Sequence, residues 1–138
     1  MNKPNRFRFR AWDKEHKLMI EIHTDTSRYS LITMCSFGNQ VGFIYADGSS
    51  FWNPHCVLMQ SIGLLDKNGN EIFEGDICRF KYASSTNPVG IIKWDADYLK
   101  FFMYPFSMLT LHLFDDVEVI GNIYENQELY EPTLVHSA

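Results

Sequence analysis

The chain has 138 residues, of which 46% are hydrophobic and 15% aromatic, and its formal net charge is −5. This length indicates one domain, or one domain with a small accessory lobe, and the apolar content excludes an intrinsically disordered chain. The negative charge excludes a protein that coats nucleic acid over its whole surface. The abundance of aromatic residues favours β-structure over a helical bundle.

The first element is predicted at residues 6–12, where basic and apolar residues alternate. Successive side chains of a strand point to opposite faces, so one face carries three arginines and a tryptophan. These residues are Arg6, Arg8, Arg10 and Trp12. A polar turn at residues 13–17 and an apolar run from Leu18 to Ile22 complete a predicted hairpin.

The middle of the chain contains the clearest turn signal. Residues 24–57 have no regular pattern apart from a predicted strand at 41–46. After an apolar run at 58–62, the Asn68-Gly69 pair predicts a turn, because both residues tolerate positive φ. A second apolar run follows at 72–80, interrupted by Gly75.

Further strands are predicted at 89–94, 98–104, 109–113 and 117–124, with a terminal helical turn at 125–130. Many short strands with turn signals between them are typical of an all-β barrel or sandwich. No long segment has the helical period, which argues against a layered α/β fold.

Three segments resemble the YopX family of phage and prophage proteins. Gly63 to Ile77 is similar to the family's central hallmark, Phe9 to Asp13 to its opening segment, and Glu118 to Asn126 to its closing segment. The chain departs from the family pattern at Ser61-Ile62 and at Gln127. The resemblance implies an SH3-like small β-barrel with additional N-terminal strands. It implies no catalytic residues, because the family has no established activity.

The resemblance and the strand pattern together suggest two regions. We expect a β-rich segment over residues 1–57 that contains the N-terminal hairpin. We expect an SH3-like barrel with a C-terminal tail over residues 58–138.

Other residue combinations were weighed as sites of chemistry. Asp66 to Asn70 lacks the glycine and glutamate spacing of an EF-hand calcium loop. Glu74 and Asp76 can be compared with the carboxylate pair of a glycoside hydrolase, but the glycine between them favours a bend. The three cysteines, Cys35, Cys56 and Cys78, show no metal-binding or disulfide spacing. We therefore predict no catalytic residue, no metal and no cofactor.

The arginine face remains the most suggestive functional feature. Alternate residues of a strand lie about 7 Å apart, close to the phosphate repeat of an extended nucleic acid, and Trp12 can stack on a base. The alternative is a solvated face, or a face that pairs with the acidic end of the chain. Residues 1–10 carry four basic residues and no acid, whereas residues 101–138 carry six acids and no Lys or Arg.

The leading hypothesis is a phage-encoded, non-enzymatic binding protein whose partner is a host or phage protein. Nucleic-acid binding is the second hypothesis, and hydrolysis by Glu74 and Asp76 the third. The aromatic residues of 101–104 and 106–114 suggest a homo-oligomer. The N-terminus lacks a secretory signal, and the least charged run, 101–114, is too short to span a bilayer as a helix. We therefore expect a protein of the bacterial cytoplasm with no membrane partner.

Overall fold

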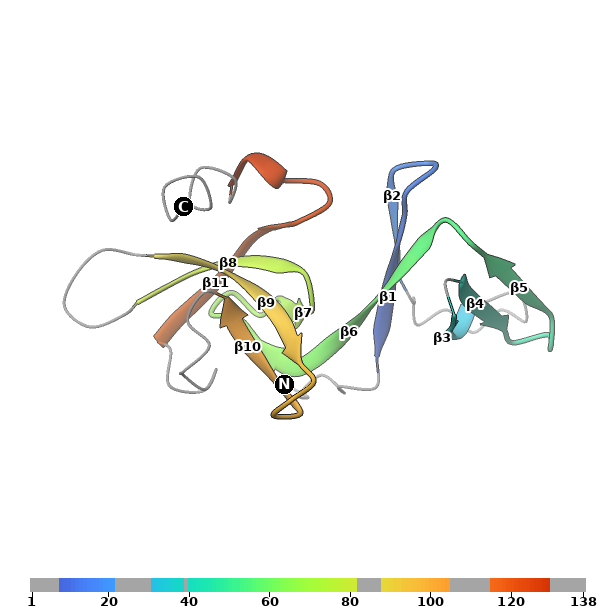
Figure 1. Ribbon diagram of the computed structural model, residues 1–138, viewed down its shortest axis with the longest axis horizontal. Coiled ribbons are helices and arrows are strands. Elements are labelled where there is room, and N and C mark those ends of the chain that lie inside the picture. The colour runs from blue at the N-terminus through green and yellow to red at the C-terminus, as the bar shows by residue number, and fades with distance from the viewer. Residues whose placement is uncertain (1–7, 22–30, 39, 82–87, 105–114, 130–138) are drawn as a thin grey trace. The chain divides into compact units, whose positions relative to one another are not determined.

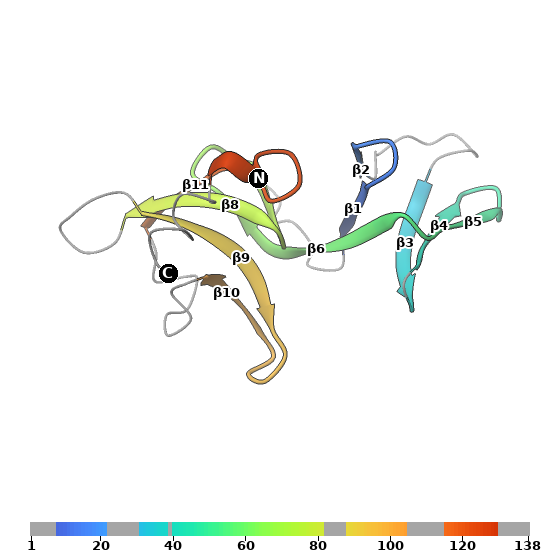
Figure 2. The same cartoon turned by 45° about the horizontal axis from the view of Figure 1, so that its top comes forward.

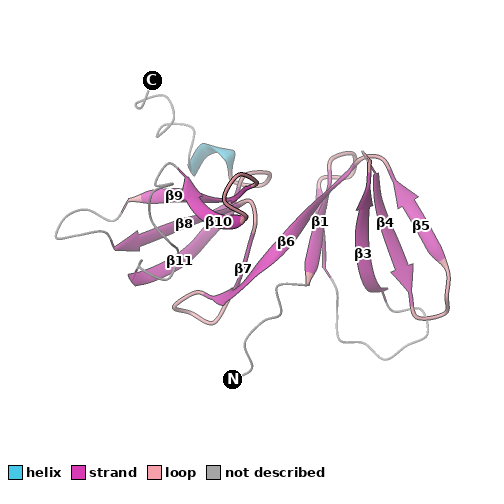
Figure 3. Cartoon of the chain, turned by 60° about the horizontal axis from the view of Figure 1, so that its bottom comes forward, coloured by secondary structure: helices cyan, strands magenta, loops and turns pink. Residues whose placement is uncertain are grey.

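The computed structural model describes residues 8–21, 31–38, 40–81, 88–104 and 115–129. These residues form strands joined by turns, with one short 3-10 helix, as Figures 1 and 3 show. The strands are β1 (Phe9–Asp13), β2 (Leu18–Glu21), β3 (Leu31–Phe37), β4 (Gln40–Tyr45), β5 (Ser50–Asn53), β6 (Cys56–Leu65), β7 (Glu71–Phe73), β8 (Asp76–Lys81), β9 (Val89–Asp95), β10 (Lys100–Tyr104) and β11 (Asp115–Asn122). The 3-10 helix η2 is Gln127–Leu129. The prediction of an all-β protein is confirmed.

Contacts divide the described residues into two units, one within residues 5–61 and one within residues 62–138. We call them the N-terminal unit and the C-terminal unit. The chain passes from one to the other inside β6, whose first part pairs with β1 and whose sheet continues to β7. The boundary predicted at residues 57 and 58, and the SH3-like description of the barrel, stay predictions.

The N-terminal unit combines the antiparallel β1–β2 hairpin and the start of β6 with a three-stranded sheet in the order β3-β4-β5. The turn before β4 uses Gly38 and the turn before β5 uses Gly48, whose φ angles are 59° and 88°. Ala11, Met34, Val41, Phe43 and Cys56 form the core of this unit, so side chains from both sheets meet in one cluster. Apolar burial of this kind is the main force that holds such sheets together.

The C-terminal unit is built on an antiparallel sheet in the order β10-β9-β8-β11. Figure 2 shows that this sheet is strongly curled. The core comprises Ile72, Cys78, Phe80, Ile92 and Met103. The predicted strands at 89–94, 98–104 and 117–124 are confirmed as β9, β10 and β11, while the one at 109–113 lies outside the described residues.

Two glycines of this unit allow close packing that no other residue permits. A Cβ at Gly90 would lie 2.4 Å from Cγ of Met103, a residue with no exposed surface. A Cβ at Gly121 would lie 2.5 Å from Oδ1 of Asn126. The same Asn126 oxygen accepts a hydrogen bond from the N–H of Asn122, which fixes the turn after β11. The predicted terminal turn is confirmed as the 3-10 helix that follows.

Among the described residues, no helix is both long enough and apolar enough to cross a membrane.

Candidate functional site

The structure gives different environments to the residues predicted for nucleic-acid contact. Arg6 lies outside the described residues, and Arg8 is exposed just before β1. Arg10 is only 8% exposed and Trp12 only 7%, and Ala11 on the opposite face is fully buried. Alternation along the strand predicted one solvated face, but β1 is covered on both faces. Of the three described residues, Arg8 alone presents an exposed side chain, and nucleic-acid contact stays a prediction.

The turn between β1 and β2 is organised by Asp13. Its Oδ1 accepts hydrogen bonds from the N–H groups of Glu15 and His16, at 2.9 Å and 3.0 Å. Its Oδ2 lies 2.9 Å from Nδ1 of His16. The backbone hydrogen bond from His16, followed by the contact with its ring, lowers the pKa of Asp13. The hydrogen bond and negative charge of Asp13 raise the pKa of His16 in return.

Asp66 joins two parts of the C-terminal unit that are far apart in sequence. Its Oδ1 accepts hydrogen bonds from the N–H groups of Asn68 and Asn70, at 2.9 Å and 2.8 Å. Its Oδ2 accepts one from the N–H of Val119 on β11, at 2.9 Å and 53 residues away. Burial by itself raises the pKa of Asp66, but these backbone hydrogen bonds outweigh burial and lower the pKa overall. The segment predicted as a turn is thus a turn, with a long-range contact that its sequence did not reveal.

The carboxylate pair at Glu74 and Asp76 lies in the turn between β7 and β8. Asp76 is 1% exposed, and its Oδ2 accepts a hydrogen bond from the N–H of Phe73 at 2.8 Å. Gly75 has a φ of 89°, donates a hydrogen bond to the carbonyl of Ile92 and accepts one from the N–H of Ile123. A buried carboxylate that stabilises its own turn is poorly placed to activate water. Asp76 therefore has a structural role.

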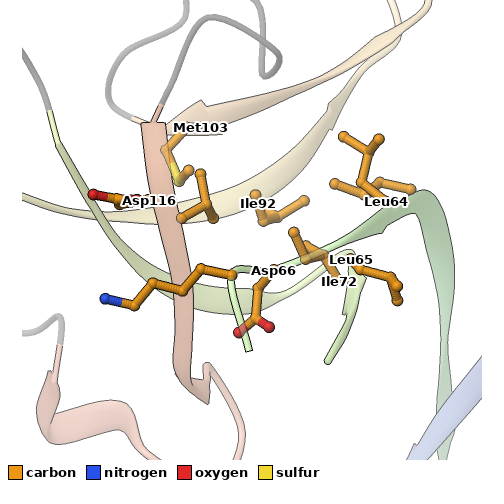
Figure 4. Close-up of a pocket in the computed structure, with 10 residues that line it drawn as sticks. Leu64, Leu65, Asp66, Ile72, Ile92, Met103 and Asp116 are labelled. Atoms are coloured by element: carbon orange, nitrogen blue, oxygen red, sulfur yellow. The ribbon is translucent and has the colours of Figure 1, made fainter. Parts of the chain in front are cut away.

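A cavity of about 280 Å³ opens in the C-terminal unit (Figure 4). Most of its lining is aliphatic and comes from β6, β7, β9, β10 and β11. Figure 4 shows the Asp66 carboxylate directed away from Ile92 and Met103. Among the described residues, Lys67 and Asp116 supply the other charged groups of the lining. A lining of this kind suits an apolar side chain or ligand that has charged groups next to it.

The charge of Asp116 at this cavity is balanced by a lysine on the neighbouring strand β8. Its Oδ2 lies 2.9 Å from Nζ of Lys81 on β8, and this contact lowers the pKa of Asp116. Glu118 on β11 likewise lies 3.6 Å from Arg79 on β8, measured between Oε1 and Nη1. Part of the acidic C-terminal region thus takes its basic partners from the adjacent strand.

The three cysteines are free thiols. Cys56 and Cys78 are buried, and burial raises the pKa of Cys56 to about 11, which keeps it protonated at neutral pH. Cys35 is partly exposed. The described residues contain no cluster of three His, Cys, Asp or Glu side chains that could hold a metal ion.

The sequence comparisons agree with the fold. The family model described as YopX protein matches residues 8–131, which confirms the resemblance of the three segments. Among solved structures, the crystal structure of protein EF1440 from Enterococcus faecalis is similar, with 32% sequence identity and a TM-score of 0.58. The match covers 90% of this chain and 97% of that one. No curated protein matches the chain.

Removal of the Asp66 carboxylate should destabilise the protein strongly. We expect Asp66→Ala to lower the free energy of unfolding by roughly 3 kcal/mol, because hydrogen bonds to a charged group contribute about 1.5–3 kcal/mol each and are not additive. Urea denaturation measures the loss. The lowered pKa means that the wild-type contribution is present above the ordinary value of 3.8 and is lost as pH falls through the folded-state pKa.

Asp95→Ala is the matched control for this change. The Asp95 carboxylate also accepts hydrogen bonds in a turn of the C-terminal unit, from the N–H groups of Asp97 and Tyr98, but both partners are local. We expect a smaller loss of stability than in Asp66→Ala. Equal losses in the two variants would contradict the role assigned to the contact with Val119.

The Asp13–His16 contact should be visible in a proton NMR titration. In Asp13→Asn the negative charge is lost, so the pKa of His16 should fall toward its ordinary value of 6.5. Glu15→Gln is the control, because Glu15 lies 3.9 Å from the His16 ring and has a smaller effect on its pKa. Since the folded-state pKa is raised, the contact stabilises the protein below pH 6.5 and its contribution disappears as pH rises through that raised value. An unchanged pKa in Asp13→Asn would refute the assignment.

Proposed function

This chain belongs to the YopX family, and we propose that it is a non-enzymatic binding protein that acts through its surface. The resemblance to phage and prophage proteins supports a phage or prophage origin and a place of action in the bacterial cytoplasm. We propose that its partner is a host or phage protein and that the chain also associates with itself.

Several polar side chains in the segments that resemble the family hold turns of the fold. This supports a role in binding through the surface rather than in catalysis. Asp66 and Asp76 accept hydrogen bonds from backbone N–H groups in turns. Asn122, which is 7% exposed, accepts hydrogen bonds from the N–H groups of Tyr124 and Glu125 after β11. Side chains used in this way maintain the fold and leave recognition to other surfaces.

The observation that carries the proposal is the exposure of large aromatic side chains. Phe51 and Trp52 on β5 are 54% and 46% exposed. Trp94 and Tyr98, at the β9–β10 hairpin, are also exposed. Aromatic residues contribute strongly to protein interfaces because they bury large areas with little loss of conformational freedom.

Strand β5 is the candidate surface for the host or phage partner. It pairs with β4 and lies at the edge of the sheet as the described residues define it. The Phe51 ring stacks on Phe43, with 6.2 Å between centroids, and Trp52 packs over Gly42, where a Cβ would meet the ring at 2.9 Å. Both aromatic side chains are therefore supported by the sheet while they remain partly exposed. An edge of this kind can accept an added strand from another protein.

A quantitative pull-down from infected bacterial cells tests this role. Phe51→Ser removes an exposed ring from β5, whereas Leu18→Ser removes an exposed apolar side chain from β2 of the same unit. We expect wild type and Leu18→Ser to retain the same partner, and Phe51→Ser to bind the purified partner at least tenfold more weakly, which corresponds to about 1.4 kcal/mol. Equal binding by both variants would exclude β5, and the absence of any specific partner would refute the proposed function.

Nucleic-acid binding is the second candidate, and the exposed side chain of Arg8 supports it. Nucleic-acid binding is less favoured than protein binding, because the net charge is −5 and both Arg10 and Trp12 are buried. If this candidate is correct, the protein should shift labelled single-stranded DNA at low salt, and Arg8→Ala should weaken the shift. Lys14→Ala removes another exposed cation of the same unit and serves as the control. No shift at low salt would exclude this function.

A further inference from the structure

Two hairpin turns of this chain share one construction. In each, an aspartate begins the turn and its Oδ1 accepts hydrogen bonds from the N–H groups two and three residues later. For Asp13 the distances are 2.9 Å and 3.0 Å, and for Asp95 they are 2.9 Å and 3.3 Å. The fourth residue after the aspartate has positive φ in both turns, 55° at Lys17 and 53° at Leu99. The β1–β2 and β9–β10 turns are therefore an internal comparison.

The side chains at the ends of these turns are very different. The β1–β2 turn carries His16 and Lys17, whereas the β9–β10 turn carries Tyr98 and Leu99, which are 77% and 74% exposed. The turn itself does not require apolar residues, since the β1–β2 turn forms without them. A bulky residue with positive φ also carries a conformational cost. Inside the hairpin, Nζ of Lys100 lies 5.9 Å from the centre of the Tyr98 ring, but Tyr98 and Leu99 stay largely exposed, which points to a further contact outside the hairpin.

The apolar surface continues from the turn onto the strands beside it. Trp94 is 44% exposed, and its ring makes an edge-to-face contact with Phe101, with 4.9 Å between the centroids. Figure 2 shows β9 running into this turn and β10 leaving it. We call Trp94, Tyr98 and Leu99 the apolar tip. The tip presents large apolar side chains on a hairpin whose backbone is held by strand pairing.

The cavity of the same unit has the size and lining to receive such a tip. Its volume is about 280 Å³, and a cavity of about 150 Å³ lined by aliphatic residues already accommodates a benzene ring in another protein. Ile92 and Met103 belong to its lining although they are only 1% and 0% exposed, and Leu64, which is 38% exposed, is an accessible apolar side chain of that lining. A leucine or tyrosine side chain that entered this cavity would exchange water for apolar contacts.

The tip cannot enter the cavity of its own chain. Ile92 and Met103 line the cavity and face each other across the β9–β10 hairpin. The pairing continues for three more residue pairs, ending at Asp95 and Lys100. At about 3.3 Å per residue, the hairpin holds its tip roughly 10 Å beyond the cavity wall. An apolar tip that fills this cavity must therefore come from a second copy of the chain.

Both surfaces carry charges of each sign: Asp97 and Lys100 flank the tip, with Nζ of Lys100 5.9 Å from the centre of the Tyr98 ring, and Asp66, Lys67 and Asp116 line the cavity. Asp97 is exposed beside the tip, and Lys67 is exposed at the cavity that it helps to line. The other carboxylate near the opening, Asp116, lies 2.9 Å from Lys81, so its charge is already balanced. A second copy would bring the Asp97 carboxylate toward the Lys67 ammonium group as its tip approached. Opposite charges at the edge of an apolar contact favour the correct orientation of the two chains.

We propose that Tyr98 and Leu99 of one copy insert into the cavity of a second copy, beside Leu64 and Lys67. This inference specifies the interface of the self-association proposed above and rests on that proposal. Because tip and cavity are different surfaces, two copies can exchange tips in a closed dimer, or bind head-to-tail and leave one tip and one cavity for further copies. Closed dimers, rings or short chains of molecules are the expected products.

Three identical substitutions at exposed leucines test the interface. Leu99→Asp places a charge on the tip, Leu64→Asp places one at the cavity, and Leu18→Asp is the control on β2, where Leu18 is 47% exposed. Light scattering after gel filtration, over a range of concentrations, measures the molar mass. We expect wild type and Leu18→Asp to associate equally, and the other two variants to associate at least tenfold more weakly.

Mixing the two defective variants provides a sharper test. Leu99→Asp retains an intact cavity and Leu64→Asp retains an intact tip, so one contact can form between them. An equimolar mixture should therefore give a heterodimer and no larger species, although each variant alone associates at least tenfold more weakly than wild type. An interface that does not use the tip and the cavity would not produce this complementation. Failure of the mixture to associate would overturn the inference.

A fourth variant distinguishes loss of the interface from loss of folding. Tyr98→His combined with Leu99→Lys transfers the side chains of the β1–β2 turn to the β9–β10 turn, where the same backbone geometry accepts them. We expect thermal unfolding no lower than in wild type, with self-association lost. If this variant and both defective leucine variants still associate as wild type does, the interface is wrong while self-association stands.

A wild type that is monomeric at every concentration would overturn both proposals. The cavity would then have another occupant, such as a side chain of a partner protein.

Discussion

The C-terminal unit depends on one carboxylate. Asp66 is 6% exposed, and its negative charge is compensated by hydrogen bonds from the Asn68–Asn70 turn and from Val119 on β11. The N–H of Lys67 adds a hydrogen bond to the carbonyl of Val117 at 2.9 Å. Because Asp66, Lys67 and Val117 also line the cavity, the contact that joins the turn to β11 determines the shape of one of its walls. Stability and the proposed recognition surface thus share the same residues.

The family segments have a consistent physical explanation. Gly75 bridges the carbonyl of Ile92 and the N–H of Ile123, and Asp76 stabilises the turn that gives Gly75 its positive φ. Gly121 leaves room for the Asn126 side chain. These residues are needed where the backbone approaches another strand or reverses direction. Such requirements preserve a scaffold, while the exposed tips and edges remain available for partners.

Sequence reasoning succeeded where the determinants were local. The β1–β2 hairpin followed from alternation and from the polar segment between its strands. The turn predicted from Asn68-Gly69 is also present, although only Gly69 of the pair has positive φ. It was less successful for β1, where alternation implied one solvated face and Arg10 and Trp12 are buried. Alternation identifies the residues that share a face but does not show what packs against that face.

By itself, the sequence determined the all-β class, the positions of most described strands and turns, and membership of the family, because turn chemistry and strand period act over a few residues. Only the tertiary structure decided that Asp66 reaches Val119 and that a cavity is lined in part by β9 and β10. It also decided that two turns of equal geometry carry polar side chains in one case and apolar side chains in the other. These features depend on packing between residues separated by tens of positions, and no local pattern specifies such contacts.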